Sequence, residues 1–134
     1  AAEPTDRIEQ MLWQKFMLAA CLGAAALALG VNAGMVCRTA EGEGLLADAM
    51  HEVAALARSS GIALDDSDVA QALAFVRSFP PEATTSLQRD VEARRACEYD
   101  ALPGAVARLA RRCGYAPQVF PRIEGMIRQR GLLP

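Results

Sequence analysis

The sequence of 134 residues predicts an all-α domain, and three observations lead to that fold class. Hydrophobic residues make up 52% of the chain but aromatic residues only 5%. The apolar content is therefore mainly Ala, Leu and Val, which suits closely packed helices better than a sheet. Apolar side chains recur every three or four residues in several segments, as in amphipathic helices. No convincing stretch alternates apolar and polar residues between turn residues, which is the pattern of strands.

The first predicted helix covers most, but not all, of the most apolar run of the chain, residues 8–37. Thr5 or Asp6 can cap it, and Gly30 ends it after Leu29. Its length is near that of a membrane span. However, the run is rich in Ala and Gly, and the residues before it include acidic side chains rather than a basic leader. We therefore interpret it as a central helix of a soluble domain, buried on most sides.

Lys15 is the one cation in residues 8–37 and lies near the start of this apolar segment. On a helix, Lys15 shares a face with apolar residues three or four positions apart: Ile8, Met11, Leu12, Leu18, Ala19 and Leu22. A lysine in such a stripe either extends to the surface along its aliphatic stem or is held in a cleft where an ammonium is needed. The residues alone leave both readings open.

Further helices are predicted along the rest of the chain by periodicity, capping residues, glycines and prolines. A turn that includes one short helical turn is expected over residues 31–37, and a surface connection is expected over residues 38–44. Pro80 and Pro81 should end the third helix, and Pro103 should lie in the first turn of a helix capped by Asp100. A linker is expected over residues 95–99. The predicted later helices are residues 43–59, 68–78, 86–94, from Asp100 to Arg112, and 117–130.

Charge and cysteine usage exclude some functions. With 14 basic and 16 acidic residues the chain is nearly neutral, which argues against nucleic-acid binding. The cysteines form no Cys-x-x-Cys pair and His51 is the one histidine, so a metal site is not expected. We interpret His51 as a half-exposed surface residue. We interpret the cysteines as buried, reduced thiols of a cytoplasmic protein: Cys21, Cys37, Cys97 and Cys113.

The residue types alone show no self-contained catalytic constellation: no dinucleotide fingerprint, no Walker loop and no triad motif are present. Two stretches nevertheless resemble the ketopantoate reductase family. Residues 85–106 (TSLQRDVEARRACEYDALPGAV) resemble its serine-to-glutamate motif, with identities at Ser86, Asp90, Arg95, Glu98, Asp100 and Gly104. In the N-terminal half, Leu12-Trp13-Gln14-Lys15 resembles its tryptophan-x-lysine segment, and Asn32-Ala33-Gly34 resembles its asparagine-glycine turn.

The resemblance implies a fold and an activity. Enzymes of this family, 2-dehydropantoate 2-reductases, use NADPH to reduce ketopantoate on the pathway to pantothenate. They combine an N-terminal Rossmann domain with a C-terminal helical domain similar to that of 6-phosphogluconate dehydrogenase. Residues 1–134 correspond to the helical domain alone, so we expect a Rossmann domain that binds most of the NADP to precede it. The isolated domain should then be inactive.

The resemblance also assigns roles to single residues. Lys15 falls on the catalytic lysine, where an ammonium can protonate the alkoxide formed by hydride transfer. Ser86 and Glu98 fall on substrate-binding positions, and Asn32 stands near a third. The implied partners are a small 2-oxo acid, the Rossmann domain and, as a further option, a second copy in a homodimer. Neither nucleic acid nor membrane is expected as a partner.

Three positions depart from the family pattern. Asparagines are usual where this chain has Ala19, Gly23 and Ala83. Loss of amides removes hydrogen bonds from a substrate site, so the substrate could be another 2-oxo acid or the activity on ketopantoate could be weak. Two other hypotheses stay open: a helical dimerisation or interaction domain of a diverged reductase, and a small helical membrane protein.

Overall fold

The computed structural model describes the backbone of residues 4–94 and 97–133 and the side chains of residues 7–94 and 99–133. This part of the chain is helical and contains no strand, so the all-α prediction is confirmed. The elements in chain order are α1 (Pro4–Leu29), a short 3-10 helix η1 (Ala33–Arg38), α2 (Ala40–Ser59), α3 (Asp66–Arg77), α4 (Ser86–Glu92), α5 (Cys97–Ala101), α6 (Pro103–Arg112) and α7 (Val119–Gln129).

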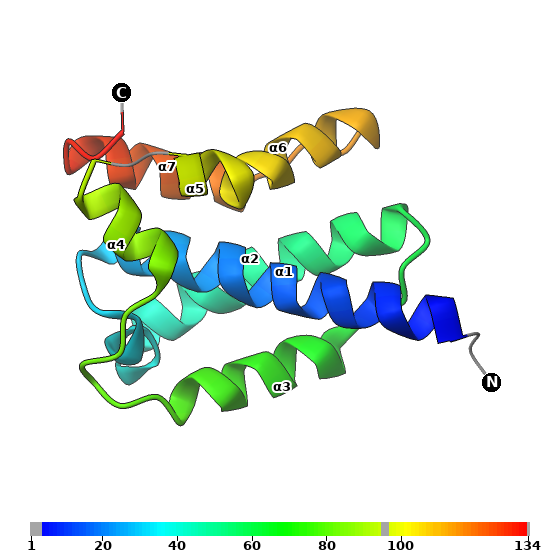
Figure 1. Ribbon diagram of the computed structural model, residues 1–134, viewed down its shortest axis with the longest axis horizontal. Coiled ribbons are helices and arrows are strands. Elements are labelled where there is room, and N and C mark those ends of the chain that lie inside the picture. Colours follow the sequence, from blue (N-terminus) through cyan, green and yellow to red (C-terminus); the bar gives the residue numbers. More distant parts are fainter. Residues whose placement is uncertain (1–3, 95–96, 134) are drawn as a thin grey trace.

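Helix α1 is the centre of the arrangement. Figure 1 shows α1 and α2 in the middle, α3 along one side and α5, α6 and α7 along the other, with α4 near the C-terminal end of α1. Helix α1 contacts α2, α3, α4, α6, α7 and η1. It can lie among so many helices because residues 20–28 of α1 are mostly Ala, whose small side chains let neighbouring backbones approach closely.

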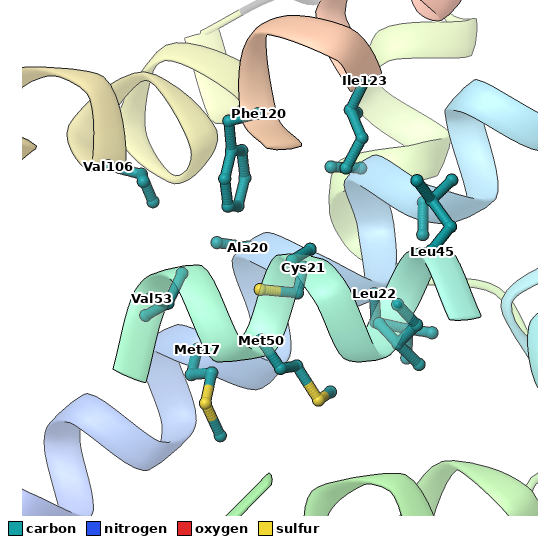
Figure 2. Close-up of a cluster of buried hydrophobic side chains, with 14 of the residues drawn as sticks. Met17, Ala20, Cys21, Leu22, Leu45, Met50, Val53, Val106, Phe120 and Ile123 are labelled. Atoms are coloured by element: carbon teal, nitrogen blue, oxygen red, sulfur yellow. The ribbon is translucent and has the colours of Figure 1, made fainter. Parts of the chain in front are cut away.

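The core lies between α1, α2 and α7. Figure 2 shows Phe120 of α7 directed towards Ala20 of α1, with Cys21 of α1 and Met50 of α2 beside them. All four residues are at most 2% exposed, so this region is densely packed. Each large apolar side chain buried in this way stabilises the fold by about 1.5–3 kcal/mol relative to exposure.

One helix of the described residues, over Arg7–Leu29, is long and apolar enough to cross a membrane. In the structure, 56% of that segment is buried against the other helices. This burial supports the prediction that α1 is the core helix of a globular domain.

The apolar stripe around Lys15 does not face the core in its N-terminal part. Ile8, Met11 and Leu12 are 57%, 56% and 60% exposed, whereas Leu22 near the other end of the same stripe is buried. The core is covered instead by the opposite face, which carries Met17, Ala20, Cys21 and Ala24. Periodicity identified this stripe as apolar but could not tell which helices would cover it.

Most predicted helix ends are confirmed, since they depend on local chemistry. Asp65 caps α3 in a capping box with Asp68, and the helix begins at Asp66, two residues before the predicted start. Gly61 follows α2 with φ +84°, a left-handed conformation that favours glycine. The predicted short helical turn is η1, and Pro103 lies in the first turn of α6 as expected.

Three local predictions are wrong. Residues 40–44 are not a surface connection but the first turns of α2, because the Thr39 hydroxyl accepts a hydrogen bond from Gly42 N (3.0 Å) and caps the helix. Residues 97–99 belong to α5 rather than to a linker. Asp100 lies inside α5 and pairs with Arg108, and Leu102 takes the N-cap position of α6.

The prediction of buried thiols holds for Cys21 but not for every cysteine. Cys37 is half-buried and Cys113 is exposed, close to Ser60 Oγ (3.5 Å), and the side chain of Cys97 lies outside the described residues. The described cysteines Cys21, Cys37 and Cys113 are free thiols, as expected. His51 is a half-exposed surface residue, as expected, and its Nδ1 lies 3.5 Å from Asp66 Oδ1.

Candidate functional site

Helix α1 carries Lys15 on its surface between two turns of apolar residues. Lys15 is exposed, and no described residue forms an ion pair with its ammonium group. Leu18, Ala19 and Leu22 follow it at helical spacing, so they line the same side of α1. The position of Lys15 is therefore fixed by the longest and most deeply packed helix of the domain.

The loop after α3 brings Ser86 towards α1. This loop lies against η1, because Gly34 N donates a hydrogen bond to the Ala83 carbonyl (3.0 Å). A Cβ atom on Gly34 would lie 1.8 Å from the Pro80 carbonyl oxygen, so only glycine permits this approach. Thr85 then caps α4 by accepting a hydrogen bond from Gln88 N (3.0 Å), which places Ser86 at the first position of the helix.

Lys15 and Ser86 line the same hollow, of about 320 Å³. Its polar side chains are the Lys15 ammonium and the hydroxyl groups of Thr85 and Ser86. The rest of its wall is apolar and comes from α1, the loop after α3, α4 and the residue before α6: Leu18, Ala19, Leu22, Phe79, Leu87 and Leu102. A cation beside two hydroxyl groups in an otherwise apolar hollow suits a small anion with a reactive polar group.

A second hollow of about 230 Å³ lies next to the first and shares Lys15 and Leu18 with it. Gln14 Nε2 donates to Asp68 Oδ1 there (2.6 Å), which links α1 to α3. Asp68 Oδ2 accepts from Asp65 N (2.9 Å), so this buried carboxylate both links α3 to α1 and completes the cap of α3. Lys15 therefore stands on a ridge between two depressions, one of which contains Ser86.

The three residues that stand where the family usually has asparagine lie in different environments. Ala19 is exposed and lines the hollow with Lys15. Gly23 is buried, and a Cβ atom on it would lie 2.5 Å from Leu87 Cδ2. Ala83 lies in the loop before α4 and uses its carbonyl to hold η1. Only the first of the three could present a longer side chain to the hollow without displacing neighbours.

One predicted site residue, Asn32, lies outside this hollow, and another, Glu98, has a side chain that lies outside the described residues. Asn32 is exposed just before η1, and its side chain makes no capping hydrogen bond. It is not among the residues that line the hollow with Lys15. The backbone of Glu98 lies in α5, but its side chain is outside the described residues, so its role stays a prediction.

Comparison with known proteins identifies the family. A family model described as "Ketopantoate reductase PanE/ApbA C terminal" matches residues 7–130. The chain belongs to this family. Two curated relatives, the 2-dehydropantoate 2-reductases of two Mycobacterium tuberculosis strains (CDC 1551 / Oshkosh and ATCC 25618 / H37Rv), are each 38% identical over 68 residues. That match covers 51% of this chain and 23% of each relative.

Solved structures of ketopantoate reductases share the fold of this family member. A dimeric ketopantoate reductase from Staphylococcus aureus superimposes with a TM-score of 0.81 at 20% identity, covering 94% of this chain and 45% of that one. A 2-dehydropantoate 2-reductase from Methylococcus capsulatus gives a TM-score of 0.77 at 25% identity, covering 93% and 43%. A PanE/ApbA family ketopantoate reductase from Ralstonia eutropha JMP134 gives 0.73 at 26% identity, covering 89% and 40%. The chain thus spans less than half the length of these proteins.

One buried carboxylate of this ketopantoate reductase C-terminal domain was missed from the sequence. Glu52 of α2 is 5% exposed, and its two oxygens accept hydrogen bonds from the backbone N–H groups of Gln118 (2.5 Å), Val119 (3.0 Å) and Phe120 (2.9 Å). These groups begin α7, where no side chain of α7 itself provides a cap. A single acidic residue in an otherwise apolar stretch of α2, with no capping residue before α7, is the pattern that could have revealed it.

Glu52 also affects the core next to it. Burial raises the pKa of the Cys21 thiol, and the negative charge of Glu52 raises it further. Glu52 is therefore a structural carboxylate that fixes α7 on α2, and it lies on the core side of α1 rather than in the hollow with Lys15.

Proposed function

We propose that this chain is the substrate-binding and catalytic domain of an NADPH-dependent reductase of 2-oxo acids, with Lys15 as general acid. The observation that carries the proposal is the hollow shared by Lys15 and Ser86, which come from distant parts of the sequence. Both fall on positions that the family resemblance assigned to catalysis and substrate binding. Membership of the PanE/ApbA family supports the reaction class.

The choice of cation supports the assignment of Lys15. It is the only lysine of the chain, and the other basic residues are arginines. An arginine is always charged and does not give up a proton, whereas a lysine ammonium can. Reduction of a ketone leaves an alkoxide that must be protonated, so the one cation that can supply a proton lies where the chemistry needs it.

In the proposed mechanism, Ser86 donates a hydrogen bond to the carboxylate of the 2-oxo acid, and the Lys15 ammonium donates to its keto oxygen. A nicotinamide cofactor, when bound, supplies the hydride. As negative charge develops on the keto oxygen, Lys15 stabilises it and transfers a proton to it. Glu98 accepts a hydrogen bond from the new hydroxyl group or from Lys15 and keeps the ammonium oriented.

The cofactor belongs to a second domain in this proposal. The residues of this chain fit the substrate side of the site: an ammonium and two hydroxyl groups face the hollow, and the sequence holds no glycine-rich nucleotide fingerprint. Ile8, Met11 and Leu12 are exposed on the same side of α1 as Lys15. A Rossmann-type domain docked over them would cover this apolar surface and close the hollow to water. A cytoplasmic location is part of the same proposal.

The deciding experiment measures NADPH oxidation by the full-length protein with ketopantoate and a panel of other 2-oxo acids. Lys15→Ala should lower kcat by about 10²–10⁴-fold, the usual range for loss of a general acid. Lys15→Arg should be nearly as impaired, because it keeps the charge but not the proton. Ser86→Ala should act mainly on KM. Arg7→Ala, which removes another basic side chain of α1, is the matched control and should leave turnover unchanged.

Two outcomes would reject the proposal. If Lys15→Ala turns over like the wild type, Lys15 is not the acid. If the folded wild-type protein reduces no 2-oxo acid, the competing hypothesis of a helical interaction domain without reductase activity takes its place.

A further inference from the structure

We infer that the preferred substrate is a 2-oxo acid whose side chain is apolar and carries no hydroxyl group. This inference rests on the proposed function and concerns the part of the substrate beyond its keto and carboxylate groups. Ketopantoate carries a hydroxyl group on that part. An unhydroxylated analogue of the same shape should therefore be reduced more efficiently than ketopantoate itself.

The wall of the hollow supplies the argument. Its polar groups are close to the chemistry: the Lys15 ammonium is assigned to the keto oxygen and Ser86 to the carboxylate. The Thr85 hydroxyl accepts a hydrogen bond from Gln88 N in capping α4, and Thr85 directly precedes Ser86, so this hydroxyl lies on the carboxylate side of the hollow. The other described residues that line the hollow are apolar: Leu18, Ala19, Leu22, Phe79, Leu87 and Leu102. None of them can pair with a hydroxyl group on the substrate side chain.

The apolar wall is also packed in a way that excludes a polar replacement at one key position. Gly23 lies one helical turn beyond Ala19, and Leu87 occupies the space that a side chain on Gly23 would need. Leu87 itself is buried and lines the hollow. Leu87 on α4 therefore packs against the backbone of Gly23 on α1. At this point the wall of the hollow is formed by the leucine side chain.

Removal of a hydroxyl group from water without a new partner is unfavourable, whereas a methyl group gains from burial. Apolar pockets discriminate against an added hydroxyl group by up to about 10²-fold. We therefore expect a preference of about 10- to 100-fold in kcat/KM. A carboxylate such as that of Glu98 reaching the distal hydroxyl would give the opposite preference, so the measurement separates the two arrangements.

The test compares two substrates that differ by one atom. Ketopantoate is 4-hydroxy-3,3-dimethyl-2-oxobutanoate, and 3,3-dimethyl-2-oxobutanoate has the same carbon skeleton without the hydroxyl group. The full-length protein with NADPH should reduce the second at least about tenfold more efficiently. Equal efficiency, or a preference for ketopantoate, would overturn the inference but leave the proposed reductase function intact. Absence of turnover with both, and with all other 2-oxo acids, would overturn the proposed function as well.

A variant makes the wall itself testable. Ala19 is exposed within the hollow, so Ala19→Asn adds an amide there without disturbing the core. It should shift the ratio of kcat/KM towards ketopantoate. Ala74→Asn makes the same substitution at an exposed position of α3 and should leave the ratio unchanged. If Ala19→Asn folds, remains active and leaves the ratio unchanged, the apolar lining does not determine the preference and the inference fails.

Discussion

Leu87 Cδ2 lies 2.5 Å, and Leu87 Cβ 2.9 Å, from the point where a Cβ atom on Gly23 would be. Helix α4 therefore rests on the bare backbone of α1 at this point. The contact fixes the height of α4 above α1, and Ser86 directly precedes Leu87 in the chain. The distance between the two sides of the hollow is thus set by the absence of one side chain.

A methyl group on Gly23 should destabilise the domain. Gly23→Ala forces Leu87 to move, and overpacking of this kind costs about 1–3 kcal/mol in the free energy of unfolding. Leu87→Ala should cost about 2–5 kcal/mol by itself, but the double variant should be more stable than the sum of the single changes predicts. Urea unfolding of the four proteins measures this coupling.

Gly44→Ala is the matched control for that cycle. Gly44 lies within α2, and a Cβ atom there would meet nothing within 4 Å. This variant should gain about 0.5–1 kcal/mol because alanine has the higher helix propensity. Strict additivity of Gly23→Ala and Leu87→Ala would show that the two residues do not compete for the same space.

Glu52→Gln should weaken the attachment of α7 to α2. The amide nitrogen of glutamine cannot accept the N–H hydrogen bonds that one carboxylate oxygen accepts from Gln118, Val119 or Phe120. A buried donor left without an acceptor costs about 1–3 kcal/mol. Chemical unfolding monitored by circular dichroism should show this loss. Glu82→Gln, at an exposed position of the loop after α3, should be neutral, and equal stability of both variants would contradict the role assigned to Glu52.

The described thiols should react in order of exposure. Cys113 should be labelled first by a thiol reagent, Cys37 later and Cys21 only after unfolding. Burial raises the pKa of Cys21 above its ordinary value of 9.0 and, more weakly, that of Cys37. A rise in pH to 9 should therefore leave Cys21 unlabelled in the folded protein. Peptide mapping by mass spectrometry identifies the modified residue, and labelling of Cys21 in the folded protein would contradict its burial.

The raised pKa of Cys21 also sets the sign of a pH effect on stability. A thiol that stays protonated in the folded state but ionises in the unfolded state at about 9.0 leaves stability complete below that pH. Above it, the unfolded state loses protons that the folded state retains, so the free energy of unfolding should fall as the pH rises. Cys21→Ala should remove this part of the alkaline slope.

Asp65 should contribute to stability at neutral pH and lose this contribution in acid. Hydrogen bonds from the Ser67 hydroxyl (2.6 Å) and from backbone N–H groups at the start of α3 lower the pKa of Asp65 below 3.8. The folded state therefore binds the proton less readily than the unfolded state, and stability falls as the pH drops below the unfolded value. Asp65→Asn keeps a capping side chain but should show a weaker acid dependence of Tm.

The exposed carboxylate Glu82 provides the comparison for that measurement. Glu82→Gln changes the net charge as Asp65→Asn does, without altering a helix cap. If both variants show the same dependence of Tm on pH between 6 and 3, the effect comes from net charge and not from the cap at Asp65.

Features fixed by neighbouring residues were predictable from the sequence. The caps at Asp65 and Gly61 and the first-turn Pro103 follow from chemistry within one helical turn. The start of α2 was missed because Gly42 resembles a loop residue. In the structure a Cβ atom on Gly42 would lie 2.0 Å from the Val36 carbonyl oxygen, so this glycine serves the packing of η1 on α2.

Features that depend on distant residues were not predictable from periodicity. The pattern of α1 marks Met11 and Leu12 as apolar but does not say that they remain exposed. The pairing of Lys15 with Ser86 followed from the family resemblance, and the hollow they share is consistent with it. Glu52 was missed because its partners lie in another helix. Glu98 and Asn32 remain predictions.

The packing of α1 has a consequence for the order of events during synthesis. Within this domain, helix α1 leaves the ribosome before its neighbour α7 and before Arg130, whose guanidinium donates to the Leu27 carbonyl. Until then, the part of α1 that packs against α7 has no permanent cover, and exposed apolar surface of this kind promotes aggregation. The domain can reach its native packing only after α7 has emerged, and chaperones have access to this part of α1 throughout that interval.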